Sequence, residues 1–515
     1  MFDGLRFAAY RSAIGAATLL AFRAQRVPPL VPPVPNHPSA VPFRESFPQM
    51  PIADLVDPRD LPHDDDARLR RVDASARLLG LMAAIAPATV AAVPSREADW
   101  VGAVYTRLLR RSWPLAPRLP DDLRPRRPGE AVDVLARLAV KGPFASYLRA
   151  DPDEAGSYVL DVSWMLGYPV RPGLLPPGGV ALLHSSPDGL RTVRISRGDG
   201  QHPGVEPSRW RGRVLERDAL LAGLNEDLTT FRHNVGVHLA VMTPFAVATA
   251  RCLGVDHPVR RLLHHCFHTV LVGNRELGKL QLGGPRAFAP RIFSHDHDTI
   301  ARMANDYLAR FDFWDFESPQ QFSARGTATT AFPYPYRDNV MQMWQATSSY
   351  AARFLDLYLA PSAPTQDPEL RRWLDELDRL LPNGIRRTGV DSDRSWLARV
   401  CAVVIHLSTV EHDVLNNLTW DYSTPSWVVP TVVPLNGERM DRRRSFDLVA
   451  TLIGTWKPYT MLLQADIPSL APDQRGADVM RVWLDEMRAI DAGMRADGED
   501  GGLTYPANLN VSVSN

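Results

Sequence analysis

The chain has 515 residues, in which 58 lysines and arginines balance 58 aspartates and glutamates. A chain of this length can bury a large core, as roughly two or three domains or as one large helical unit. Without a net positive charge it lacks the basic surface of a nucleic-acid-binding protein, so we expect a small-molecule partner and no nucleic-acid partner. Its three cysteines are too few for a disulfide framework, which favours a reducing compartment, and we expect a cytoplasmic protein.

The first 65 residues are predicted to form an N-terminal helix and an extended arm. Residues 7–26 (FAAYRSAIGAATLLAFRAQR) are amphipathic, and they do not predict a signal peptide because arginines interrupt the apolar run. We expect this helix to pack on the protein's own surface; contact with a membrane surface through residues 1–25 is the alternative. The prolines of residues 27–42 remove backbone donors and favour an extended connector. No uncharged apolar run reaches the roughly 18 residues that predict a transmembrane span.

From residue 66 onward the pattern predicts a mainly α protein with one small β element. Helical periodicity dominates residues 66–150, and short β-branched runs between glycines and prolines predict the β element at about residues 158–216. Residues 217–515 are predicted as a helical core that ends in a short extended tail. Within this core, residues 220–253 form a long helix that is apolar on most faces, so it must lie inside the fold.

Two pairs of residues in the helical core are candidate metal ligands. His412 and Asn416 are four apart, which places both side chains on one face of an α-helix. His233 and His238 are five apart, so an α-helix would separate them by about 140 degrees, and they converge only if the helix carries a π-bulge, which Gly236 could ease. Imidazole nitrogens mixed with amide and carboxylate oxygens suit a redox-active metal such as iron. The alternative is that these buried histidines are satisfied by carbonyls or water.

Three other groups of residues compete as metal sites. They are His264 with His268, His295 with His297, and His63 with Asp65. The first pair has Cys266 between its members and suits zinc, although helix packing is the simpler interpretation. The second group lies in a predicted loop before a helix, where polar residues start the helix. The third has the spacing of 2-oxoglutarate oxygenases, which need a β-jelly roll that this helical chain does not supply.

Four segments, in the same order along the chain, resemble the lipoxygenase family. They are PFAVATARCLGVDHPVRRLLHHCF (244–267), YPYRDNVMQMW (334–344), DPELRRWLDEL (367–377) and GLTYPANLNVSVSN (502–515). The resemblance implies a large helical catalytic domain with a long, central, π-bulged helix, here residues 66–515, without the family's N-terminal lipid-binding β-barrel. It also implies one non-haem iron per chain, in place of which the same ligands would accept manganese.

The resemblance also implies the residues of the site. The implied iron ligands are His233, His238, His412, Asn416 and the α-carboxylate of Asn515. A C-terminal extension is then expected to damage the iron site, and Gly278 and Leu282 match the residues that position substrate and oxygen. The implied reaction inserts O2 into the 1,4-pentadiene of a polyunsaturated fatty acid and gives a hydroperoxide. Iron-bound hydroxide takes the hydrogen, without a separate catalytic side chain, and we expect a monomer.

Acidic residues beside the second ligand pair depart from the family pattern. Glu411 and Asp413 make that helix more polar than a fatty-acid channel predicts, unless their side chains point away from the iron. This departure favours the alternative of an iron oxygenase that acts on a more polar metabolite. An iron-free binding protein that kept the fold is a third hypothesis, and the intact ligand types at all matched positions argue against it.

Overall fold

The structure of the chain is a computed structural model. It describes residues 30–42 except 37, 51–54, 133–197 except 188, 212–386 except 286, 393–416, 428–435, 460–496 and 504–513. The helix predicted over residues 7–26 and most of the helical region predicted at 66–150 therefore lie outside the described residues. The division of the chain at residue 65 stays a prediction.

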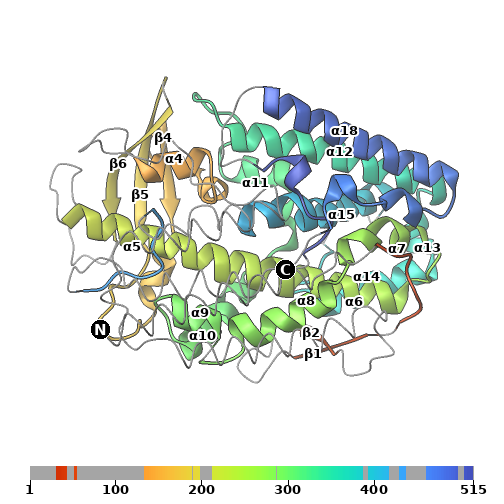
Figure 1. The fold of residues 1–515 in the computed structure, drawn as a ribbon, viewed down its shortest axis with the longest axis horizontal. Helices are drawn as coiled ribbons and strands as arrows, with labels where there is room; N and C mark the ends of the chain where they lie inside the picture. Colours follow the sequence, from red (N-terminus) through yellow and green to blue (C-terminus); the bar gives the residue numbers. More distant parts are fainter. Residues whose placement is uncertain are drawn as a thin grey trace, which may run out of the picture.

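Two antiparallel sheets account for the described strands. The smaller pairs β1 (Ser39–Pro42), at the end of the proline-rich segment, with β2 (Pro51–Asp54). The larger contains β3 (Arg149–Ala150), β4 (Ser157–Asp161), β5 (Val180–Ser186) and β6 (Gly189–Ser196), in that order across the sheet. Helix α4 (Val134–Val140) packs against β6. The small β element predicted from short β-branched runs is confirmed, and its strands lie at one end of the molecule (Figure 1).

One continuous long helix runs through the molecule (Figure 1). It begins as α5 (Gly212–Glu226), continues as the π-helix η5 (Asp227–Met242) and ends as α6 (Thr243–Cys252). Nearly every η5 side chain is buried, as its apolar composition predicts. Among the described helices it alone is long and apolar enough to cross a membrane, but most of its apolar part is buried inside the protein. That burial is typical of a core helix.

The remaining α-helices and π segments of the described chain lie around this central helix. They are α7 (Pro258–Leu263), α8 (Val270–Leu277), η7 (Gly278–Leu282), α9 (Phe288–Ile292), α10 (His297–Ala309), α11 (Ser318–Ala324), α12 (Pro335–Tyr358), α13 (Ala363–Gln366), α14 (Pro368–Leu380), α15 (Arg394–His406), η9 (Leu407–Glu411) and α18 (Gln474–Ala496). Aspartate caps begin several of them; Asp367, for example, accepts hydrogen bonds from the first backbone amides of α14. Figure 1 shows α12 and α18 side by side, and α12 also packs against α15.

The tail returns from α18 into the core. Leu509, Val511 and Val513 are fully buried, and Leu462 N donates to the carbonyl of Leu509. Ser512 Oγ donates to the His268 carbonyl at 2.7 Å, which joins the tail to the segment that follows α7. The predicted fold class, mainly α with a long π-bulged helix and a small sheet, is confirmed.

Candidate metal centre

The π-helix η5 brings His233 and His238 together. Its hydrogen bonds run from residue i to i+5, as in the bond from Thr243 N to the His238 carbonyl, so residues five apart lie nearly above one another. The two Nε2 atoms are 3.1 Å apart, and both side chains are buried. The five-residue spacing that predicted a π-bulge is therefore met by a π-helix of 16 residues, longer than a single bulge.

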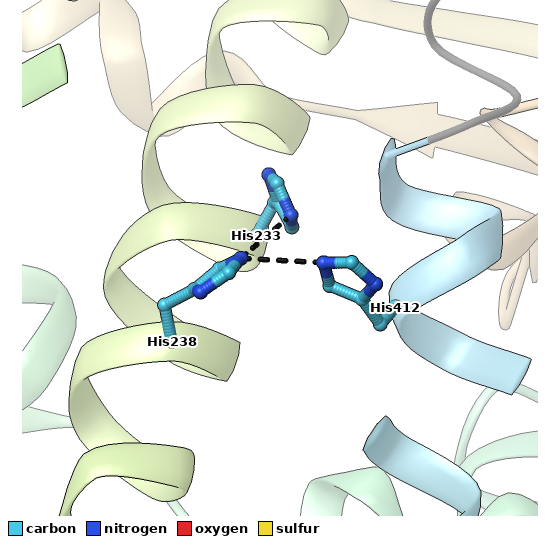
Figure 2. Close-up of side chains that lie close together, drawn as sticks. All are labelled: His233, His238 and His412. Atoms are coloured by element: carbon cyan, nitrogen blue, oxygen red, sulfur yellow. Dashed lines mark hydrogen bonds between the residues drawn. The ribbon is translucent and has the colours of Figure 1, made fainter. Parts of the chain in front are cut away.

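His412 completes a group of three imidazoles from the opposite helix (Figure 2). It follows η9, a second π segment, in which His412 N donates to the carbonyl of Leu407. Its Nε2 lies 3.3 Å from Nε2 of His238. Possible ligand atoms of the three histidines all lie within 4.8 Å of one another. In the part of the chain that the structure describes, this is the only group of three or more histidines, cysteines and carboxylates that could hold a metal.

Hydrogen bonds around His238 settle which ring nitrogen carries its proton. Asn274 Nδ2 donates to the His238 carbonyl at 2.8 Å and to Thr243 Oγ1 at 2.7 Å, so its Oδ1 is the acceptor that faces the ring. His238 Nδ1 lies 2.7 Å from that oxygen and donates to it. The lone pair of His238 is therefore on Nε2, which points at the other two rings. Orientation of a ligating histidine by a partner on its other nitrogen is typical of metal sites.

The charge state of the rings also fits a metal. Burial, together with the neighbouring His238 and His412 rings, holds the pKa of His233 well below the usual 6.5 of histidine. Burial and His238 do the same to the pKa of His412. Neutral imidazoles are the form that binds metal.

The distances between the ring nitrogens also fit a single bound metal ion. Metal–imidazole bonds of about 2.1 Å place neighbouring ligands of an octahedral ion about 3 Å apart. The Nε2 atoms of His233 and His412 lie 3.1 Å and 3.3 Å from Nε2 of His238. Two of the three pairs of nitrogens therefore have the spacing of neighbouring ligands, and all three histidines lie close enough together to bind one ion.

The other predicted site residues are only partly located. Asn416 is buried four residues after His412, as expected, whereas Asn515 lies outside the described residues. Gly278 and Leu282 are both buried in η7, the π segment that follows α8 and its residue Asn274. Their roles as ligands and as positioning residues stay predictions.

Glu411 and Asp413 are buried rather than solvated. Burial raises the pKa of Glu411 above its usual range, although the nearby guanidinium groups of Arg232 and Arg325 lower it. The carboxyl group therefore lies inside the protein, among positive charges.

Packing or helix capping accounts for the competing histidine groups that the structure describes. His264 Nε2 lies 2.8 Å from the Val31 carbonyl of the proline-rich segment. Burial raises the pKa of Cys266 to about 12, so its thiol is not a ready zinc ligand. In the group at residues 294–298, Asp296 caps α10 by accepting from Thr299 N, and His295 pairs with buried Glu226 at 2.8 Å. His63 and Asp65 lie outside the described residues.

Fold and site together define a helical protein with a buried group of three histidines that fits a metal site, two of them on a π-helix and the third directly after a second π segment. The family model described as Lipoxygenase matches residues 228–435, which include all three histidines. A crystal structure of a lipoxygenase in complex with arachidonate superposes with a TM-score of 0.73 at 14% identity, covering 93% of this chain and 79% of that one. The chain thus matches the lipoxygenase family model over its central part and has the fold of the lipoxygenase structures.

Two curated relatives from distant organisms each match a little under half of the chain. Linoleate 9/13-lipoxygenase of Pseudomonas aeruginosa is 29% identical over 250 residues, which are 46% of this chain and 36% of that protein. Hydroperoxide isomerase ALOXE3 of Homo sapiens is 28% identical over 255 residues, 47% of this chain and 35% of that protein. The matched part is thus about a third of the length of either relative.

Proposed function

We propose that the protein is a non-haem iron dioxygenase that adds O2 to the 1,4-pentadiene of a polyunsaturated acyl chain and gives a hydroperoxide. The observation that carries this proposal is the buried group of His233, His238 and His412, with His238 held in the metal-binding tautomer by Asn274. A bound iron would supply the one-electron chemistry needed to break a weak bis-allylic C–H bond. Asn416 and the α-carboxylate of Asn515 are proposed as further ligands, and manganese as a metal that the same ligands would accept.

The surrounding chain would position the substrate and keep water out. Apolar side chains flank the histidines on the same helices, and Val235, Val237 and Val410 are fully buried. An apolar surrounding suits an acyl chain, and it holds the reacting carbon at a fixed distance from the metal. Gly278 and Leu282 are proposed to contribute to this positioning. The monomeric state, the cytoplasmic location and membrane contact through residues 1–25 stay predictions.

Oxygen consumption with linoleate tests the proposal. Protein purified with iron should bind about one iron per chain, consume O2 in the presence of linoleate and form a conjugated diene. The His238→Ala variant should lose both the iron and the activity. Thr347→Val, which alters a buried hydroxyl that has no partner among the described residues, should keep both. Iron-loaded protein that gives no response to any polyunsaturated acyl chain would contradict the proposal.

A second candidate substrate is an acyl chain or metabolite that already carries a polar group. Buried Glu411, close to the charges of Arg232 and Arg325, favours it, because a purely apolar substrate would leave this cluster without a role. The relation to a hydroperoxide isomerase points to the assay. If this candidate is correct, the protein should consume a linoleate hydroperoxide faster than linoleate. The Glu411→Gln variant should instead consume linoleate faster, with its iron content unchanged.

A further inference from the structure

The side chain of Tyr147 joins two residues of the π-helix that are five positions apart. Tyr147 is the last residue of the short 3-10 helix η3 (Ala145–Tyr147), between α4 and the sheet. Its hydroxyl donates to Asp227 Oδ2 at 2.5 Å, and the guanidinium carbon of Arg232 lies 4.6 Å from the centre of its ring. One phenol thus contacts a carboxylate through its edge and a cation through its face.

Arg232 is fixed to the same short helix by its other contacts. Its Nη1 donates to Ser146 Oγ at 3.1 Å and reaches the Ser146 carbonyl at 3.4 Å. Tyr334, in turn, donates from its hydroxyl to the Ala145 carbonyl at 2.5 Å, which ties η3 to the start of α12. The hydrogen bond from Tyr334 therefore holds η3 in place, and with it the backbone of Tyr147.

The spacing of Asp227 and Arg232 is the spacing of His233 and His238. In a π-helix residues five apart are nearly aligned, so both pairs are brought together by the same backbone register. In an α-helix each pair would be separated by about 140 degrees. A change from π to α in this segment would break the contacts of Tyr147 at the same time as it separated the two histidines.

We infer that Tyr147 is a positioning residue that holds η5 in the π register and thereby sets the distance between His233 and His238. Its hydrogen bond and its ring contact are both satisfied only in that register. The environment of the bond is consistent with this role. Burial raises the pKa of Asp227 to about 6, while the Tyr147 hydrogen bond and the Arg232 charge lower it. Tyr147 and Arg232 therefore offset part of the cost of burying the charged carboxylate.

Hydrogen exchange of the metal-free protein tests the inference without relying on the proposed function. Tyr147→Phe keeps the ring but removes the bond to Asp227, and amide exchange in Asp227–Met242 should rise about tenfold over wild type. Tyr350→Phe is the matched control, because Tyr350 is buried and stacked on Trp483, and its hydroxyl has no partner in the part of the chain that the structure describes. It should leave exchange in Asp227–Met242 unchanged. A rise of equal size in Pro335–Tyr358 would show general destabilisation and overturn the inference.

Titration with Co²⁺, followed by its visible absorption, gives the second measurement. Tyr147→Phe should raise the Co²⁺ dissociation constant about tenfold and alter the spectrum, and Tyr350→Phe should do neither. Asp227→Asn retains an oxygen that can accept the hydrogen bond and should behave nearly as wild type, whereas Asp227→Leu should resemble Tyr147→Phe. Wild-type affinity in both Tyr147→Phe and Asp227→Leu would overturn the inference. Failure of wild-type protein to bind Co²⁺ would instead contradict the metal site, and the exchange measurement would still decide the role of Tyr147.

Discussion

At the scale of single residues, one neutral amide determines how His238 faces the metal centre. Asn274 donates to a backbone carbonyl and to Thr243, and it accepts from His238 Nδ1. Aspartate in its place would offer only acceptors, and an apolar residue would offer neither group. The asymmetry of the amide is therefore what fixes the tautomer of the ring.

Asn274→Leu should weaken metal binding about 10- to 100-fold, because His238 loses the partner that orients it. The measurement is iron content after dialysis against a series of chelator concentrations. Thr347→Val removes a buried hydroxyl that has no partner within the described ranges and should bind metal as wild type does. Unchanged affinity in Asn274→Leu would show that packing alone orients His238.

The sequence predicts some of these residues and not others, for physical reasons. His233 and His238 were predictable because a spacing of five has no use in an α-helix, so the pair itself indicates the π register. Asn274 was not, because one amide in a helix such as VLVGNREL has no periodicity to single it out. Glu411 could be seen in the sequence, but the positive charges beside its buried carboxyl group come from Arg232 and Arg325, which are far away in the chain.

At the scale of elements, the Tyr307 side chain of α10 lies close to the backbone of the long helix at Gly236. A Cβ atom on Gly236 would lie 2.8 Å from the Tyr307 hydroxyl and 3.3 Å from the Phe231 carbonyl. The absent side chain therefore lets Tyr307 of α10 approach the backbone between the two histidines. The second π segment, η9, was not predicted, since His412 and Asn416 have a spacing that an ordinary α-helix already satisfies.

Gly236→Ala should lower the free energy of unfolding by about 1–3 kcal/mol, the usual cost of overpacking, and should reduce metal content. Tyr307→Phe removes the hydroxyl that the new methyl group would meet. The double variant should therefore recover part of the loss, though not all of it, because the Phe231 carbonyl stays close. Urea unfolding of the four proteins measures the coupling, and strictly additive effects would contradict this account.

At the scale of the whole molecule, the protein contains neutral histidines that are not among the candidate metal ligands. Burial lowers the pKa of His264 to about 4 and the pKa values of His265 and His406 to about 3. His406 is fully buried and its ring nitrogens have no partner among the described residues. In the unfolded chain these histidines are protonated near pH 6.5, whereas in the folded protein they stay neutral until a lower pH.

The protein should therefore lose stability on acidification, between pH 6.5 and about 3 for His406. Each such histidine contributes about 1.4 kcal/mol per pH unit to the slope of the unfolding free energy. His406→Leu should make that slope shallower by about one proton, with little loss of stability at pH 7. Val404→Ala, which removes buried apolar volume on the same helix, should lower stability equally at every pH. Equal slopes in wild type and His406→Leu would refute the explanation.

The two nitrogens that face each other at 3.3 Å belong to residues separated by 174 positions in the sequence. An ion held between them would close a very long loop and so act as a non-covalent cross-link. The entropy of closing such a loop is about 5 kcal/mol at room temperature, an upper bound on what the cross-link can add to stability. Removal of a bound ion by a chelator should accordingly lower the free energy of unfolding by no more than this amount.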